Sequence, residues 1–212
     1  MITSVIFDCD GVLVDSEEIA NRVLAELLTE AGLPTTYDQA VEVYRGRSME
    51  SVVATASERF GSSLPFDLSE RYYTRIKEVF ESDLRPVPGV TEALTRIDLP
   101  DCVASNGPLH KMETTLRLTG LWDRFKGRIF SADDVAAGKP APDLFLHAAR
   151  VMGFDPATTA VVEDSLFGVE AALAAGMNVF AFSSHTEPGI LAKAGGIPFT
   201  DMAQLPELLR KN

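Results

Sequence analysis

The sequence predicts an α/β protein, with a parallel sheet covered by helices and a helical block inserted after the first strand. Three observations support this fold class. A short apolar run over residues 4–8 is typical of a buried strand. From Glu17 to about Ser82 only helical periodicity follows. After Pro86, strand-like and helix-like segments alternate over about 125 residues, which is typical of a parallel sheet.

The inserted block shows the start and stop signals of several helices. Apolar residues at helical spacing predict a helix over residues 19–31, which Gly32 ends. Thr36 and Gln39 have the spacing of a capping box, so a short helix should run from there to Tyr44. Two more helices are expected, one capped by Ser48 and reaching Phe60, and one over residues 68–80.

The alternating region supplies the rest of the sheet. Strands are predicted at residues 102–104, 128–130, 160–162 and 178–182, with a last, edge strand at 197–199. Helices are expected between them over residues 90–97, 108–120, 142–153 and 165–176. The domain prediction is therefore a catalytic core of residues 1–15 and 84–212, and a helical block of residues 16–83 positioned to close over it.

Polar side chains follow four of these predicted strands. In parallel α/β sheets, ligands bind beyond the carboxyl ends of the strands. This rule brings together four short segments, which contain Asp8 and Asp10, Ser105 and Asn106, Lys139, and Glu163 and Asp164. Carboxylates this crowded repel one another unless a cation lies between them. Oxygen ligands indicate a hard cation, and Mg²⁺ suits phosphate chemistry best.

These groups suit phosphoryl transfer through a covalent aspartyl-phosphate. Asp8 would attack phosphorus, while Asp10 would protonate the leaving oxygen and then deprotonate water. Lys139 and the Ser105 hydroxyl would stabilise charge on the phosphoryl oxygens together with Mg²⁺. Asn106 is expected to contact the substrate, and the predicted metal ligands are Asp8, Asp10, Glu163 and Asp164.

Four motifs in this order make the chain resemble the haloacid dehalogenase-like hydrolase superfamily, in its subgroup with a helical cap. They are the segments 8–16, 103–107, 138–143 and 161–165. The resemblance implies a Rossmann-like core, a mobile helical cap, an Asp8 nucleophile, and Mg²⁺ held by Asp8, the Asp10 backbone carbonyl and Asp164. It leaves open whether Glu163 is a direct ligand. Dehalogenating members lack the second acid, so Asp10 favours phosphate esters.

Substrate choice is expected to depend on the cap. Arg45 and Arg47 flank Gly46 in a cap loop, where two guanidinium groups would suit an acidic phosphorylated metabolite. A solvated basic pair at a helix start explains the same residues equally well. The segment 102–108 with Lys111 resembles the 6-phosphogluconate phosphatases of this subgroup.

Two alternatives stay open beside a phosphatase. The subgroup includes β-phosphoglucomutase, whose cap histidine corresponds to Ala20 here, and whose cap-loop Lys and Arg correspond to Arg45 and Met49. These departures favour water over a sugar hydroxyl as the acceptor. A non-catalytic protein that binds a phosphorylated metabolite is the other alternative, although every expected catalytic side chain is present.

The net charge, the apolar pattern and the cysteine content argue against several classes of protein. A net charge of −12 argues against nucleic acid as a partner, because phosphate backbones require clustered Lys and Arg. No apolar run approaches a membrane span, and no secretion signal is recognisable. The 2 cysteines, Cys9 and Cys102, are expected to be buried thiols in a reducing cytoplasm. A monomer is expected, because cap and core can bury each other's faces.

Overall fold

The computed structural model describes residues 1–44, 47 and 49–212, and these residues divide into two compact units. One unit comprises Met1–Asp15 and Arg85–Asn212, and the other comprises Ser16–Leu84. The first is called the sheet unit below and the second the helical unit. That the helical unit acts as a cap stays a prediction.

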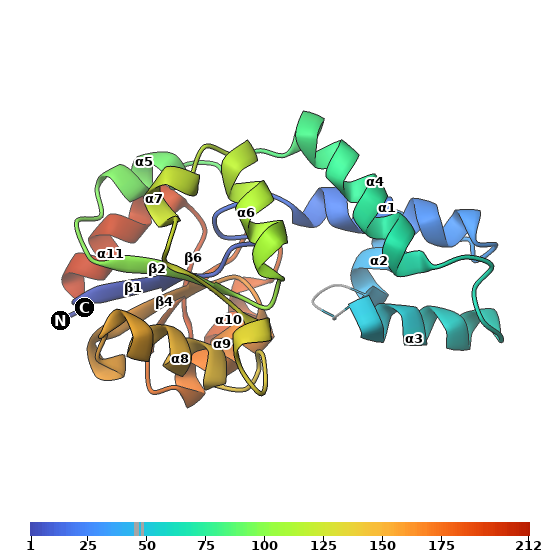
Figure 1. The fold of residues 1–212 in the computed structure, drawn as a ribbon. Helices are drawn as coiled ribbons and strands as arrows, with labels where there is room; N and C mark the ends of the chain where they lie inside the picture. The colour runs from blue at the N-terminus through green and yellow to red at the C-terminus, as the bar shows by residue number, and fades with distance from the viewer. Residues whose placement is uncertain (45–46, 48) are drawn as a thin grey trace. The chain divides into compact units, whose positions relative to one another are not determined.

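The sheet unit is built on six parallel strands (Figure 1). Their order across the sheet is β3 (Ile129–Ser131), β2 (Asp101–Ser105), β1 (Ser4–Phe7), β4 (Thr159–Glu163), β5 (Asn178–Phe182) and β6 (Ile197–Phe199). The fold-class prediction is confirmed, and residues 197–199 do form an edge strand. This order in the sheet places β1 and β4 side by side at the centre, with Phe7 opposite Val162.

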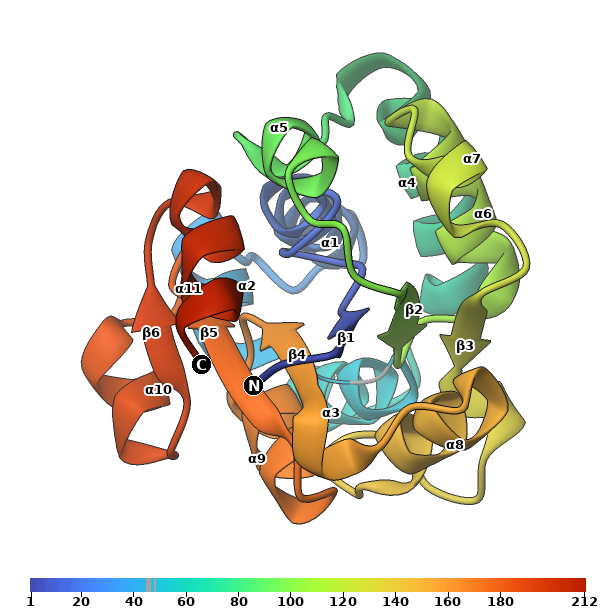
Figure 2. The same ribbon diagram turned by 90° about the vertical axis from the view of Figure 1, so that its left-hand side faces the viewer.

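Alternating side chains divide the strands between two apolar cores, because successive residues of a strand point to opposite faces. Val5 and Phe7 belong to one core and Ile6 to the other. The first core lies under α5 (Val90–Thr95), α6 (Leu109–Leu118), α7 (Trp122–Phe125) and α11 (Leu205–Lys211). The second core lies under α8 (Asp143–Met152), α9 (Leu166–Ala174) and α10 (Pro188–Lys193) (Figure 2).

Three of these helices were not expected from the sequence. The helices α7, α10 and α11 have 4, 6 and 7 residues. Two turns or fewer display little helical periodicity, and among the described helices of this length α5 alone was expected, within residues 90–97. Their apolar residues pack on the sheet all the same, as Phe125 and Leu191 do without exposed surface.

The helical unit contains α1 (Glu17–Glu30), α2 (Tyr37–Tyr44), α3 (Met49–Phe60) and α4 (Leu68–Asp83) around its own apolar core. The predicted capping box is present. The backbone N–H of Gln39 donates to Thr36 Oγ1 at 3.2 Å, and the backbone N–H of Thr36 donates to Gln39 Oε1 at 2.9 Å. The predicted cap Ser48 lies outside the described residues. No helix in the described part of the chain combines the length and apolar character of a membrane span.

Candidate active site

The candidate site is the edge of the sheet unit where β1, β2 and β4 end. Asp8 follows β1 directly, and its backbone N–H donates to the carbonyl of Val162 on β4 at 3.0 Å. Ser105 is the last residue of β2 and Glu163 the last of β4. The parallel sheet therefore brings Asp8, Ser105 and Glu163 to one edge, although up to 155 positions separate them in sequence.

Lys139 joins two of the strand-end carboxylates. Its Nζ lies 2.6 Å from Asp8 Oδ1 and 2.6 Å from Glu163 Oε1. All three side chains are buried, so these contacts are charge-assisted hydrogen bonds in a site that excludes most water. Asn106 holds the backbone of Lys139, since its Nδ2 donates to the Lys139 carbonyl at 3.1 Å and its Oδ1 accepts from the Lys139 N–H at 2.9 Å.

Burial and pairing shift the pKa values of this pair. Burial raises the pKa of Asp8 to about 7, although the ammonium of Lys139 acts against that shift. Burial alone would lower the pKa of Lys139, but the carboxylates of Asp8 and Glu163 raise it above its ordinary value. Lys139 therefore stays a fixed positive charge at neutral pH.

Glu163 is engaged through both of its carboxylate oxygens. Oε1 accepts from Lys139, while Oε2 accepts from the backbone N–H of Asp164 and of Ser165, both at 3.0 Å, and from Ser165 Oγ at 2.9 Å. The carboxylate sits beneath the start of α9, where a Cβ on Gly168 would lie 1.9 Å from its carbon. Glu163 thus fixes Lys139 and the turn that carries Asp164.

Asp164 reaches across to the loop that follows β1. A Cβ built on Gly11 would lie 2.3 Å from Asp164 Oδ2, so the carboxylate occupies the space that a side chain would fill. Gly11 also has a φ of +78°, which disfavours any residue with a Cβ. The loop after β1 and the carboxylate of Asp164 are therefore closely packed against each other.

Asp10 and Ser105 lie on the side of α6. The Asp10 carboxylate forms an ion pair with Lys111 of α6, with Nζ 2.8 Å from Oδ2. Ser105 Oγ accepts from the backbone N–H of Gly107 at 3.4 Å. Lys111 was not among the predicted site residues. The sequence does show a lysine in the first turn of the predicted helix after Ser105, and this position could have suggested a site residue.

The four predicted metal ligands do not form a cluster of carboxylates. Among the residues that the structure describes, no three acidic, histidine or cysteine side chains converge as a metal site. Asp10 pairs with Lys111, and both oxygens of Glu163 accept hydrogen bonds. Asp8 Oδ1 likewise accepts from Lys139, and the Asp164 carboxylate lies against Gly11 in the loop after β1.

The charges at this edge still fit a divalent cation. Asp8, Glu163 and Asp164 are buried acids, and Lys139 is the buried base among the described residues. Buried charge without a counter-charge is costly, so this excess of carboxylate favours a cation. Mg²⁺ commonly takes one or two carboxylates and completes its shell with other oxygens, which suits this donor set.

Of the three residues predicted to select the substrate, the structure describes Arg47. Arg45 and Gly46 lie outside the described residues. Arg47 is exposed in the helical unit and donates to Thr55 Oγ1 at 3.4 Å.

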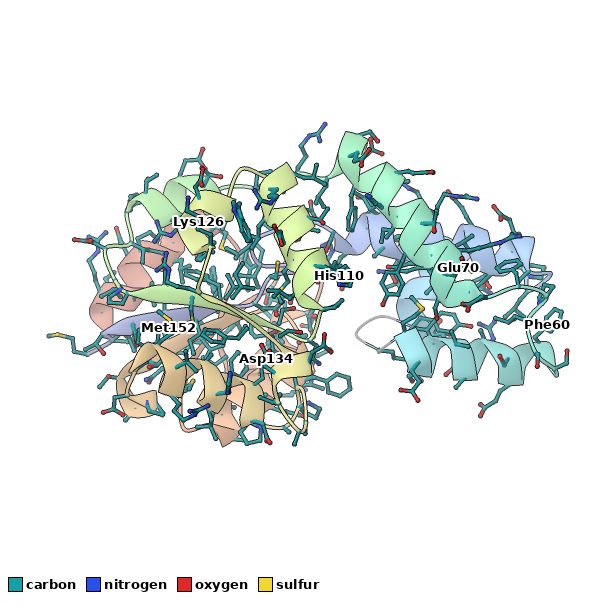
Figure 3. The ribbon with its side chains drawn as sticks, viewed as in Figure 1. Phe60, Glu70, His110, Lys126, Asp134 and Met152 are labelled. Carbon is teal, nitrogen blue, oxygen red and sulfur yellow. The ribbon has the colours of Figure 1, made fainter. Side chains whose placement is uncertain are left out.

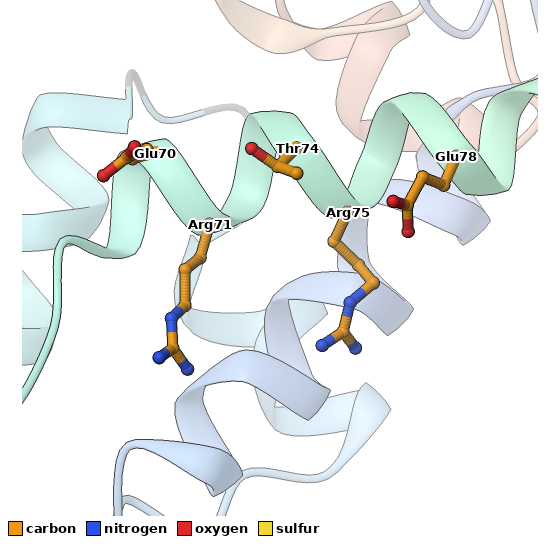
Figure 4. Close-up of a pocket in the computed structure, with 5 residues that line it drawn as sticks. All are labelled: Glu70, Arg71, Thr74, Arg75 and Glu78. Atoms are coloured by element: carbon orange, nitrogen blue, oxygen red, sulfur yellow. The ribbon is translucent and has the colours of Figure 1, made fainter.

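A surface depression on the helical unit is a structural feature rather than a second site. It is lined by Glu70, Arg71, Thr74, Arg75 and Glu78 of α4 (Figure 4). Both arginines reach toward α1, where Arg75 pairs with Glu30 at 3.3 Å and Arg71 pairs with the same glutamate at 3.9 Å. These partly exposed ion pairs join the two helices.

The match to known proteins agrees with this geometry. Residues 2–176 match the model of the haloacid dehalogenase-like hydrolases. The chain belongs to this family. The family predicted from the sequence is thus confirmed, and with it the prediction of a hydrolytic enzyme.

Named relatives of this haloacid dehalogenase-like chain cover nearly its whole length. A 6-phosphogluconate phosphatase of Escherichia coli (strain K12) is 33% identical over 210 residues, which are 98% of this chain and 94% of that protein. A haloacid dehalogenase-like protein of unknown function from Agrobacterium tumefaciens superposes with a TM-score of 0.88 at 36% identity, over 100% and 99% of the two chains. A putative β-phosphoglucomutase from Thermotoga maritima gives a TM-score of 0.81 at 27% identity, over 99% of each chain.

Proposed function

We propose that the chain is a Mg²⁺-dependent phosphatase that hydrolyses a small sugar phosphate, or an acidic one such as 6-phosphogluconate, through an aspartyl-phosphate on Asp8. The observation that carries the proposal is the buried Asp8–Lys139–Glu163 arrangement, with the Lys139 Nζ 2.6 Å from each acid. It holds a carboxylate nucleophile and a fixed cation at one end of the sheet. The phosphatase among the relatives supports the same chemistry.

The two aspartates would divide the reaction between them. An oxygen of Asp8 attacks phosphorus as the ester P–O bond breaks, and Asp10 gives its proton to the departing oxygen. Asp10 then takes a proton from water, which attacks phosphorus, and the Asp8–phosphorus bond breaks to release phosphate. Lys139 and Ser105 face the phosphoryl oxygens, on which negative charge is spread during both steps.

Mg²⁺ would be held by Asp8, Asp164 and the backbone carbonyl of Asp10, and would supply further positive charge to the phosphoryl oxygens. We propose a positioning role for Glu163, because both of its oxygens already accept hydrogen bonds. Asn106 would act in a similar way through the backbone of Lys139. The arginines at 45 and 47 stay candidates for selecting an acidic substrate.

A panel of phosphate esters tests the proposal. Purified protein with Mg²⁺ should release phosphate from one or more sugar phosphates, with kcat/KM ranking the esters. EDTA should abolish the release, and added Mg²⁺ should restore it. Asp8→Asn should retain the fold and lose turnover. Absence of hydrolysis across the panel would favour the non-catalytic binding protein, and full activity of Asp8→Asn would refute the nucleophile.

A mutase is the second candidate, because the chain superposes over nearly its full length on a putative β-phosphoglucomutase. The same cofactor and nucleophile would serve, with a sugar hydroxyl in place of water as acceptor. The chain has 3 histidines, and none lies in the helical unit, where Ala20 occupies the position of the mutase histidine. Formation of glucose 6-phosphate from β-glucose 1-phosphate with a bisphosphate primer distinguishes the two activities.

A further inference from the structure

Lys111 is a charged residue of the sheet unit that the proposed function has not used. It is the third residue of α6, and no acidic residue is present in the first turn of that helix. A cation at this place is unfavourable for the helix, because the N-terminus already carries partial positive charge. Helix stability therefore gives no reason for a lysine here.

The side chain of Lys111 instead reaches the loop after β1. Its Nζ lies 2.8 Å from Asp10 Oδ2, and the side chains of both residues are about a quarter exposed, at 25% and 23%. The two residues are separated by 101 positions in sequence. The contact is therefore made by the fold and not by the local run of the chain.

Three functional groups surround the same point at the start of α6. A Cβ built on Gly107 would lie 3.7 Å from Asp10 Oδ2, 3.8 Å from Lys111 Cδ and 3.8 Å from Ser105 Oγ. The backbone here is held by Ser131, whose Oγ donates to the Gly107 carbonyl at 2.9 Å. Lys111 thus lies beside the proposed acid–base group and the proposed phosphate ligand, on a fixed segment.

Each aspartate of the pair has its own lysine. Lys139, buried between two carboxylates, is paired with Asp8, whereas Lys111 is paired with Asp10 near the surface. This arrangement keeps two carboxylates that are two residues apart directed at different cations.

We infer that Lys111 is a positioning residue for Asp10, which it holds in the orientation required for proton transfer to the leaving oxygen. The inference rests on the proposed phosphatase function and adds to it a residue that acts through the acid–base group. The proton travels from the Asp10 carboxyl group to the ester oxygen as the P–O bond breaks, and the ammonium of Lys111 keeps its own protons throughout.

The leaving group provides a test that a purely structural role would not satisfy. A sugar alkoxide needs a proton as it departs, whereas p-nitrophenolate is a weak base and departs without one. Lys111→Met should therefore lower kcat/KM about 10- to 100-fold for the best sugar phosphate of the panel and at most about 3-fold for p-nitrophenyl phosphate. Both rates come from one sample, so any unfolded fraction cancels in their ratio.

Two further variants link the effect to charge and to Asp10. Lys111→Arg keeps the cation and should restore most of the ratio between the two esters. Asp10→Asn should lower the ratio by itself, and adding Lys111→Met to it should lower the ratio no further, because the lysine acts through that aspartate.

Lys126→Met is the matched control. Lys126 also pairs with an aspartate at 2.8 Å, but the pair is exposed and precedes β3, at the opposite end of the strands from the site. Figure 3 shows Lys126 well away from His110, the neighbour of Lys111 at the start of α6. The control should leave both esters unchanged.

Equal losses on the two esters, or no loss on either, would overturn the role of Lys111 and leave the phosphatase proposal standing. A wild-type protein that hydrolyses neither ester would instead overturn the proposed function, and the inference with it.

Discussion

Lys139→Met removes the ammonium that Asp8 and Glu163 share and replaces it with an apolar side chain of similar length. Both carboxylates are almost fully buried, with 9% and 1% of their side chains exposed. Removing one partner of a buried ion pair typically costs about 3–5 kcal/mol of unfolding free energy. For a chain of this size each kcal/mol lowers the Tm by about 2–4 °C, so a fall of about 6–20 °C is expected.

Trp122 makes the measurement selective. It is the chain's 1 tryptophan and lies on α7 in the sheet unit, so its fluorescence follows unfolding of the unit that carries the site. Thermal unfolding of wild type, Lys139→Met and the exposed control Lys126→Met is compared in EDTA. The control should match wild type, because its ion pair lies in solvent.

The pH dependence of Lys139→Met follows from the raised pKa of Asp8, which is about 7 in the folded chain and about 4 when unfolded. A group that binds its proton more tightly in the folded state loses stability as the pH rises between these values. In the wild type this loss is complete near pH 7, whereas without Lys139 the folded-state pKa of Asp8 moves higher, so the deficit of the variant should grow as the pH rises above about 7. A Tm within about 2 °C of wild type at pH 8 would refute the account of a shared, buried ammonium.

Other positions give simpler expectations. Gly11→Ala places a Cβ 2.3 Å from Asp164 Oδ2 at a φ of +78°. The variant should therefore show a kcat/KM at least about 100-fold lower and need a higher Mg²⁺ concentration for half-maximal activity. Unchanged kinetics would contradict the close packing seen there. Cys9 and Cys102 have no exposed surface and raised pKa values, so neither thiol should react with a disulfide reagent until the protein is denatured, and rapid labelling of the native protein would show otherwise. Asp101→Asn weakens the pairing of a buried carboxylate with two arginines, and an unfolding free energy lowered by about 1–3 kcal/mol in urea is expected, whereas a neutral result would mean that the arginines find other partners.

The strands and longer helices were predictable because their signals are local. Residues 178–182 and 197–199 form strands as predicted, and Ser165 caps α9 by accepting from the N–H of Gly168. The short helix α7 was missed because four residues display no periodicity, although its Phe125 is fully buried. The segments that carry the site were also predictable, since the carboxyl ends of parallel strands meet at one edge.

The division of work among the site residues was not predictable in the same way. The sequence left open whether Glu163 is a direct metal ligand or acts from behind one, and the structure shows its carboxylate held by Lys139 and by the turn at Ser165. Two adjacent acids look alike in sequence, and only their hydrogen-bond partners distinguish them. Lys111 was not predicted for a similar reason: it lies on α6, and its partner Asp10 lies in the loop after β1, far away in sequence.

By itself the sequence determined the order of the elements, the family and the kinds of side chain at the sheet edge, because these depend on local spacing and residue type. The tertiary structure alone decided which charges pair. Lys139 meets Asp8 across 131 positions and Lys111 meets Asp10 across 101. Such contacts depend on how the parallel strands lie against one another, and the free energy of a charge pair depends on burial and on distances of a few ångströms.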